Sequence, residues 1–219
     1  MQRSETPDWE PFDLRWGLPR IKAAIDCSVD RLGGLDAIIV AGGIGAYQRA
    51  VVSYYLKGKL TDEYEQQADE MIQTNLRGPA YAIECALPHL AKSWLDMERV
   101  SGGKPERLSQ VLLIGSVIPR SPPADLSMYA ATKAAMEVWI RAQARRWRSR
   151  GVAMNVLATG WIETPMTLDI DERKKREILS AIGSHRMGTM DEAAEAALWM
   201  LLRAPAYFSG DVVPMTGGL

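Results

Sequence analysis

The stretch VLLIGSVIPRSPPADLSMYAATKAAMEVW, residues 111–139, decides the fold of this chain. Its first four residues form an apolar run that predicts a buried strand, and Ser116 stands just beyond the end of that run. Two adjacent prolines then break the chain before a helical segment that carries Tyr129 and Lys133. Residues four apart lie on one face of a helix, so these two side chains are expected side by side. The stretch therefore predicts a strand, a turn and a helix that bring Ser116, Tyr129 and Lys133 together.

These three side chains suit proton transfer to or from a substrate oxygen. An ammonium beside a phenol favours the phenolate, so Lys133 is expected to lower the pKa of Tyr129 from its usual value of about 10. Tyr129 would then exchange protons near neutral pH while Ser116 holds the substrate oxygen. The Tyr-x-x-x-Lys spacing alone is a weak signal, because two amphipathic residues reaching from a helix to solvent give the same pattern.

The surroundings of these residues resemble the short-chain dehydrogenase/reductase family. A serine thirteen residues before the tyrosine, an alanine-rich helix and a second apolar run at 152–157 stand in the family's order. The segment TNLRGP places Asn75 where the family carries the asparagine of its Asn-Ser-Tyr-Lys tetrad, which holds a proton-relay water. The resemblance runs from about residue 10 to the C-terminus. It implies four catalytic residues, namely Asn75, Ser116, Tyr129 and Lys133.

Other segments resemble the side of the family's site that holds a nicotinamide cofactor. The segment LDAIIVAGGIG, 35–45, resembles the strand and turn beside the adenosine half, and Asp13 resembles a residue that contacts adenine. The segment NVLATGWIETPM, 155–166, resembles the turn whose threonine contacts the nicotinamide carboxamide. If a nicotinamide binds, the resemblance implies contacts from Asp13, Ala41, Gly42, Gly43, Gly160 and Thr164.

One part of the family pattern has no counterpart in this sequence. The family opens with a strand and the loop Thr-Gly-x-x-x-Gly-x-Gly, whose backbone amides and helix dipole hold the cofactor pyrophosphate. The segment AGGIGAY, 41–47, does not replace this loop, because the third glycine would fall on Gln48 and no helix is predicted there. We therefore expect the first strand and helix to be missing, residues 1–17 to form an atypical N-terminal segment, and no cofactor to be needed.

Alternating strands and helices predict an α/β fold, a doubly wound, Rossmann-like parallel sheet with its site at the carboxyl ends of the strands. We expect one domain over residues 1–219, in which 163–190 form a substrate lid whose charges lie on a solvated helix face. The strand at 36–40 is apolar on both faces, so it is expected to have neighbours on both sides. Without the first unit, one side of the sheet is exposed unless residues 1–17, the loop 46–60 or a second subunit covers it.

Helical spacing predicts the elements around this sheet. A helix over 21–32 is expected to end at Gly33, and a long helix over 61–90 is expected to kink at Pro79. The polar segment 92–110 is predicted to be a surface loop.

Net charge and the lengths of the apolar runs limit the possible partners. A net charge of −1 argues against nucleic acid, and no apolar run reaches the roughly 18 residues that a membrane span needs. The polar N-terminus is unlike a signal peptide, so we expect a cytoplasmic protein. Cys27 and Cys85 lie in helical patterns and are expected to be small buried side chains in a reducing cytosol. His89 and His185 show no paired ligand spacing, so no metal is expected.

A homo-oligomer, either a dimer or a tetramer, is also expected. The family commonly pairs the helices that carry Asn75 and Tyr129 across a two-fold axis. The second of these helices carries an apolar stripe that is interpreted either as a subunit interface or as part of the chain's own core. The stripe consists of Trp139, Ile140, Ala144 and Trp147.

We favour an enzyme that acts on a small carbonyl or hydroxyl substrate without a nicotinamide, by enolisation, isomerisation, elimination or cyclisation. In this interpretation Tyr129 moves the proton, Ser116 stabilises the oxyanion, and Lys133 tunes Tyr129. Asn75 anchors a water. The cofactor side departs from the family, since Val40-Ala41 replace two asparagines, whereas the proton-handling residues are whole.

Two alternatives stay open. One is an NAD(P)H-dependent ketoreductase or alcohol dehydrogenase whose cofactor loop comes from a longer start or a partner chain. The weaker one is a non-catalytic assembly partner. The sequence does not name the substrate.

Overall fold

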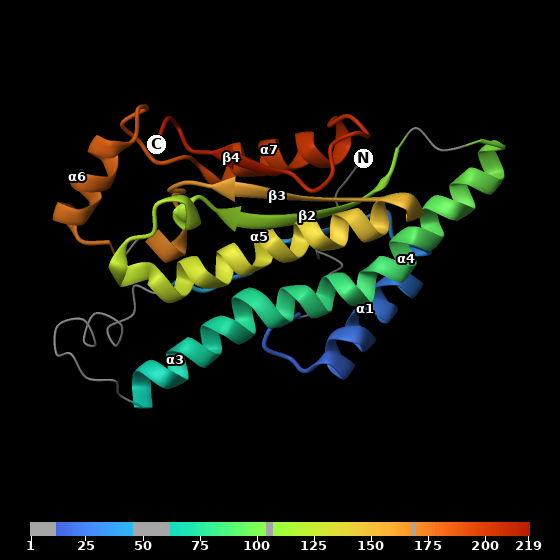
Figure 1. Cartoon of the computed structure of the whole chain (residues 1–219), viewed down its shortest axis with the longest axis horizontal. Coiled ribbons are helices and arrows are strands. Elements are labelled where there is room, and N and C mark those ends of the chain that lie inside the picture. The colour runs from blue at the N-terminus through green and yellow to red at the C-terminus, as the bar shows by residue number, and fades with distance from the viewer. Residues whose placement is uncertain (1–11, 46–61, 104–106, 168–169) are drawn as a thin grey trace, which may run out of the picture.

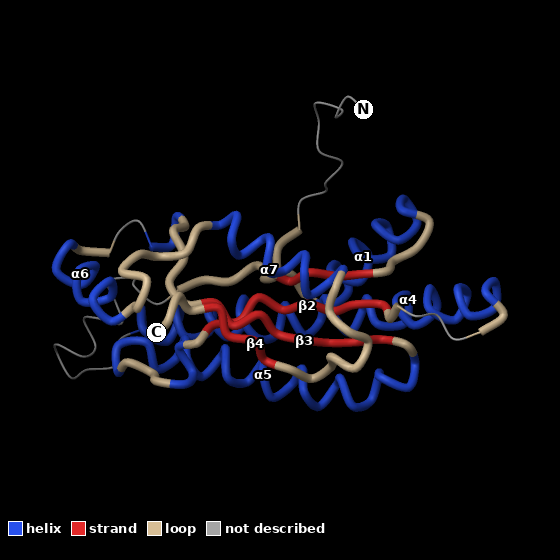
Figure 2. Tube along the Cα trace, turned by 90° about the horizontal axis from the view of Figure 1, so that it is seen from above, coloured by secondary structure: helices blue, strands red, loops and turns tan. Residues whose placement is uncertain are grey.

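A computed structural model describes residues 12–45, 62–103, 107–167 and 170–219. In this part of the chain a parallel sheet of four strands forms the centre, in the order β1-β2-β3-β4 (Figure 2). The strands are β1 (Ala37–Val40), β2 (Ser109–Ser116), β3 (Val152–Thr159) and β4 (Val212–Met215).

Helices lie on both faces of the sheet, which confirms the predicted α/β fold. Figure 1 shows α4 and α5 on one side of the sheet and α7 on the other, with α1 packed against α4 and α6 beyond the carboxyl ends of the strands. The helices are α1 (Leu18–Leu32), α3 (Asp62–Ile72), α4 (Gly78–Ser101), α5 (Ser127–Trp147), α6 (Glu172–Ala181) and α7 (Met190–Leu202).

The central strands are buried because their side chains alternate between two hydrophobic cores. Toward α4 and α5, Val111 and Leu113 of β2 pack in one cluster with Met136. Toward α7, Leu112 packs in a second cluster with Met200. Unbroken apolar runs such as that of β2 are typical of parallel strands covered on both faces.

The first helix ends as predicted, but one of its side chains is exposed against expectation. α1 ends at Gly33, whose φ of 73° is the left-handed conformation that favours glycine at a helix end. Ile21 is buried and Ile25 packs against the main core. Cys27 follows Ile25 by two residues and therefore points to the opposite side of the helix, where it is exposed. The expectation of a buried Cys27 is wrong, and Cys85 on α4 is only partly buried.

The long helix is interrupted just before the predicted kink. Between α3 and α4 the chain forms a π-helical turn, Gln73–Arg77, and Pro79 is the second residue of the next helix. At this position the missing N–H of proline does not interrupt a helical hydrogen bond. The wider turn carries Asn75 in its centre.

The predicted surface loop at 92–110 is wrong for its first ten residues, because α4 continues to Ser101. Trp94 is 7% exposed and lies against Gly151, so burial of its ring holds this part of the helix on the sheet. α4 ends at Gly102, which has a φ of 69°.

Strand β1 is paired on one side only within the described residues. It bonds to β2, and Ile39 is 46% exposed on the face opposite α4. The neighbour expected on the other side is therefore not found among these residues. Of the segments considered as covers, residues 1–11 of the segment 1–17 and the whole of the loop 46–60 lie outside the described part of the chain.

The apolar stripe on α5 belongs to the chain's own core. Ile140, Ala144 and Trp147 are buried in the main cluster, and Trp139 packs against it. The stripe therefore gives no support to an oligomer, and Val138, which is 63% exposed, is the large apolar side chain that α5 turns outward.

The charged run at the start of α6 faces solvent, as the sequence predicts. Arg173 and Glu177 are both exposed and form an ion pair at 3.0 Å, while Ile178 is buried. Asp171 begins the helix by accepting a hydrogen bond from the backbone of Lys174 at 3.0 Å. Within the described ranges, no helix is long and apolar enough to cross a membrane.

Candidate active site

A cavity of about 580 Å³ opens where the carboxyl ends of β1, β2 and β3 meet. Ser116, Tyr129 and Lys133 all line it, so the structure brings together the three proton-handling residues that the sequence predicts. Four of the six predicted cofactor-binding residues also line the cavity, namely Ala41, Gly43, Gly160 and Thr164.

Ser116 is the last residue of β2, where the strand ends at the cavity. Its Oγ accepts a hydrogen bond from the backbone N–H of Ile118 at 3.2 Å. The hydroxyl proton of Ser116 therefore stays available for an oxygen atom beside it, and Tyr129 is within hydrogen-bonding reach of the same hydroxyl.

The environment of Tyr129 differs from the one expected from the sequence. Burial raises the pKa of its phenol, and the hydrogen bond with Ser116 acts in the opposite direction with a smaller effect. Lys133 Nζ lies 5.7 Å from the centre of the Tyr129 ring. The expected net lowering of the Tyr129 pKa is therefore wrong, because loss of hydration is the largest effect on the phenol.

Lys133 is 8% exposed and reaches into the site from the second turn of α5. Burial lowers the pKa of its ammonium to about 8, since water no longer solvates the charge. Its Nζ donates a hydrogen bond to the carbonyl of Ile114 at 3.3 Å. The amine therefore sits close to its titration point near neutral pH.

Asn75 is buried at 2% exposure but is absent from the residues that line the cavity. The π-helical turn directs its amide to the loop after β1. There its Oδ1 accepts from the N–H of Ile44 at 2.8 Å and its Nδ2 donates to the carbonyl of Ile44 at 2.9 Å. Nδ2 also lies 3.4 Å from Thr132 Oγ1. The side chain thus positions the loop, and the relay water stays a prediction.

Glycines line the cavity after β1 and after β3. A Cβ at Gly43 would lie 3.2 Å from Asn75 Oδ1 and 3.3 Å from Lys133 Nζ. A Cβ at Gly160 would lie 3.2 Å from the Cα of Thr216. Gly43 therefore leaves a space beside Lys133 that a larger residue would fill. Thr164, the position that the resemblance assigns to the nicotinamide carboxamide, lines the same cavity.

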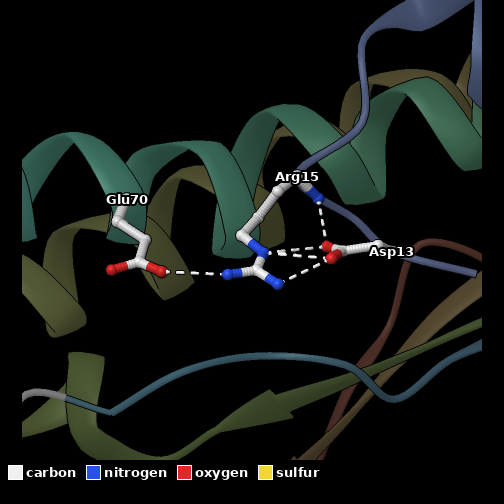
Figure 3. Close-up of polar contacts among 3 residues, drawn as sticks. All are labelled: Asp13, Arg15 and Glu70. Atoms are coloured by element: carbon white, nitrogen blue, oxygen red, sulfur yellow. Dashed lines mark hydrogen bonds and ion pairs between the residues drawn. The ribbon is translucent and has the colours of Figure 1, made fainter.

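Two predicted cofactor positions lie outside the cavity lining. Gly42 packs under Leu14, whose Cδ1 would lie 2.6 Å from a Cβ at this position. Asp13 is held by Arg15, which binds its carboxylate through Nη2 at 2.7 Å and through Nε at 3.0 Å (Figure 3). These hydrogen bonds lower the pKa of Asp13 to about 2. Arg15 also reaches Glu70 of α3, so the Asp13 carboxylate is engaged within the protein.

Sequence reasoning missed several apolar residues of the cavity. Trp161, Ile162 and Met166 follow the predicted Gly160 directly, so their place in the same segment was the available signal. α7 contributes a further wall that no motif indicated; its lining residues are Met190, Ala193, Ala194, Ala197 and Leu198. Their spacing of three and four is ordinary for any packed helix.

Comparisons with known proteins agree with this fold. A family model described as enoyl-(acyl carrier protein) reductase matches residues 19–219. The 3-oxoacyl-[acyl-carrier-protein] reductase of Vibrio cholerae is 27% identical over 199 residues, which cover 91% of this chain and 72% of that protein. The enzyme of the same name from Pseudomonas aeruginosa is 34% identical over 113 residues, which cover 52% of this chain and 46% of that protein.

Solved structures show the same fold. A putative short-chain alcohol dehydrogenase from Sinorhizobium meliloti has a TM-score of 0.77 at 20% identity, covering 94% of this chain and 73% of that chain. A short-chain dehydrogenase from Burkholderia cenocepacia, solved in complex with NADP, has a TM-score of 0.73 at 23% identity and covers 94% and 74%. The chain belongs to the short-chain dehydrogenase/reductase family, as its sequence suggested.

The expectation that no cofactor is needed is wrong. The matched relatives are named as reductases, and one neighbouring structure holds NADP while another is titled an NADH-dependent reductase. The favoured interpretation, a site that works without a nicotinamide, therefore gives way to the reductase alternative. That interpretation rests on the absence of the glycine loop. The residues that the resemblance assigns to the nicotinamide half are nevertheless present in the cavity.

Proposed function

We propose that this chain reduces a ketone to an alcohol with NAD(P)H. The observation that carries the proposal is the meeting of Ser116, Tyr129 and Lys133 in one cavity beside a glycine-lined space. The names of the relatives, which are 3-oxoacyl-[acyl-carrier-protein] reductases, support a carbonyl substrate.

Each of the three side chains has a part in handling the proton. Burial raises the pKa of Tyr129, so its phenol stays protonated at neutral pH and donates a proton to the oxygen of the reduced carbonyl. Ser116 donates a hydrogen bond to the same oxygen, because the bond that it accepts from Ile118 does not use its hydroxyl proton. The Lys133 ammonium stabilises the phenolate that remains.

The residues that would hold the cofactor line the same cavity as these donors. Ala41, Gly43, Gly160 and Thr164 would hold its nicotinamide half. When bound, NAD(P)H supplies a hydride to the carbonyl carbon. The sequence contains no recognisable glycine loop for the pyrophosphate, so those contacts are outside this proposal.

A reduction assay with the purified chain tests the proposal. Ethyl acetoacetate is offered as a neutral 3-oxo ester together with NADPH or NADH, and the loss of nicotinamide absorbance is followed alongside chromatography of the hydroxy ester. We expect equal amounts of oxidised cofactor and alcohol. Absence of alcohol with both cofactors, from a protein whose circular dichroism shows the folded α/β spectrum, would contradict the proposal.

A further inference from the structure

The cavity is built for a neutral, largely apolar ligand. Lys133 is the one charged side chain among the described residues that line it. Around the Ser116 and Tyr129 hydroxyls the walls are apolar, with Ile118 and Leu126 on the side of α5. An anionic substrate group would therefore lie there without a second cation, whereas an alkyl or aryl group gains from burial.

Met166 lies at the opening of this cavity. Its side chain lines the cavity and is also 45% exposed, which places it between the interior and solvent. It lies against Gly45 on the opposite wall, where a Cβ would come within 3.0 Å of Sδ and 3.2 Å of Cγ. The thioether therefore bridges the loop after β1 and the segment that begins the predicted lid.

The backbone beneath Met166 is held more firmly than its side chain. Met166 is in a short 3₁₀ turn, Pro165–Thr167. Thr167 Oγ1 lies 2.8 Å from the carbonyl of Ile162 and accepts from the N–H of Thr164 at 3.0 Å. Movement at this point is thus left to the unbranched methionine side chain, which adopts several shapes at low cost.

Given the proposed ketone reduction, we propose that Met166 is a specificity-determining residue that limits the size of the apolar group beside the carbonyl. With its sulfur against Gly45, the side chain narrows the opening of the cavity that Ser116 and Tyr129 also line. Replacing it by alanine removes the γ-methylene, the sulfur and the methyl group. The space so freed admits a larger group at the same carbonyl.

Two neutral 3-oxo esters test this directly. Ethyl acetoacetate and ethyl benzoylacetate differ in a methyl against a phenyl group on the ketone, and kcat/KM is measured for each. We expect Met166→Ala to raise the ratio of kcat/KM for the phenyl ester to kcat/KM for the methyl ester by about tenfold or more. This is the range of discrimination that a hydrophobic pocket gives for small apolar groups. Met166→Leu replaces the methionine with a branched side chain of similar bulk and should change the ratio less than about threefold.

Met97 provides the matched control. It is a methionine of similar exposure, 37%, on α4, and it does not line this cavity, so Met97→Ala should leave the ratio at the wild-type value. Thermal midpoints by circular dichroism check that all variants are folded, and Met166→Val carries the same test if the alanine variant is not.

Equilibrium binding separates failure of this inference from failure of the proposed function. Saturation-transfer NMR gives dissociation constants of both esters for the protein without turnover, and the phenyl preference should shift in Met166→Ala there as well. If the wild-type chain reduces neither ester but Met166→Ala still binds the phenyl ester with a shifted preference, the reductase proposal is overturned and the role of Met166 is supported. A ratio within about threefold of wild type in both assays, or an equal change in Met97→Ala, would overturn the role of Met166.

Discussion

Burial shifts the pKa values of Tyr129 and Lys133 in the directions that favour the neutral form of each side chain. The pKa of Tyr129 rises and that of Lys133 falls to about 8, and in both cases loss of hydration is the largest cause. A phenol that stays protonated and an ammonium close to its titration point suit a proton donor whose conjugate base needs support. The pair therefore suits reduction better than it suits abstraction of a proton by a standing phenolate.

The pKa of Lys133 predicts a pH limit on reduction. Above about pH 8 the lysine loses the charge that stabilises the Tyr129 phenolate, so kcat/KM for ketone reduction should fall as pH rises through this value. The pH profile at saturating NADPH measures this limb. In Lys133→Met the rate should be lower throughout, and the gap to wild type should narrow as pH rises. If the fall in kcat/KM near pH 8 persists in Lys133→Met, a group other than Lys133 causes it.

Tyr129→Phe should lower kcat by about 10²- to 10⁴-fold, because the ring keeps its place and only the proton donor is lost. The unfolding free energy should change by about 1 kcal/mol at most, the contribution of one hydrogen bond with Ser116. Tyr207, which is 96% exposed, gives the control Tyr207→Phe with unchanged rate. Turnover and chemical denaturation measure both quantities. A Tyr129→Phe chain at wild-type rate would show that Tyr129 is not the proton donor.

Among the elements, those whose structure and chemistry lie in one contiguous stretch could be predicted from the sequence. The strand, turn and helix of 111–139 carry Ser116, Tyr129 and Lys133 at fixed offsets, so local periodicity was enough to place them. The end of α4 could not be found in this way, because Trp94 is held by a glycine 57 positions later in the chain. The π-helical turn has no sequence pattern of its own, and Asn75 was placed by resemblance alone.

Gly151 shows how such a distant contact holds an element. It has a φ of 77°, and a Cβ there would lie 2.0 Å from the Trp94 ring. Gly151→Ala should therefore lower the unfolding free energy by about 2 to 4 kcal/mol, from left-handed strain and overpacking together. Gly103 has open space around it, so Gly103→Ala is the matched control. Urea denaturation measures both, and equal midpoints would contradict the contact.

The π-helical turn should act on the site through the loop it holds. Asn75→Ala removes both hydrogen bonds to the backbone of Ile44, so the Ile44 amide should lose protection from hydrogen exchange, and kcat/KM should fall as the loop loosens. Arg77 is exposed on the same turn, and Arg77→Ala should change neither quantity. NMR exchange rates of the Ile44 amide decide the matter. Unchanged protection in Asn75→Ala would show that the loop is held by other contacts.

For the whole molecule, the arrangement of layers followed from the sequence, whereas the cofactor did not. Helices on both faces of a parallel sheet are implied by the order of apolar runs and helical segments. The expectation about the cofactor relied on a missing glycine loop, yet Gly43, Gly160 and Thr164, which the family resemblance assigns to the cofactor, come from other parts of the chain and line the cavity. Loss of one recognisable segment therefore said little about the cavity formed by the rest.

The side of β1 that has no strand neighbour among the described residues predicts that the folded chain self-associates. Ala37 is exposed on this strand, β1 pairs with β2 alone among the described residues, and Ile39 and Leu198 expose apolar surface nearby at the cavity. An unpaired strand edge beside apolar surface is a ready template for another chain.

Light scattering at micromolar concentration should therefore give a mass that is a multiple of 24.3 kDa. Ala37→Lys should lower that mass, because a charged lysine on an edge strand opposes pairing, whereas Val138→Lys on α5 should not. A wild-type mass of one chain would refute self-association, and a loss of mass confined to Val138→Lys would move the interface to α5.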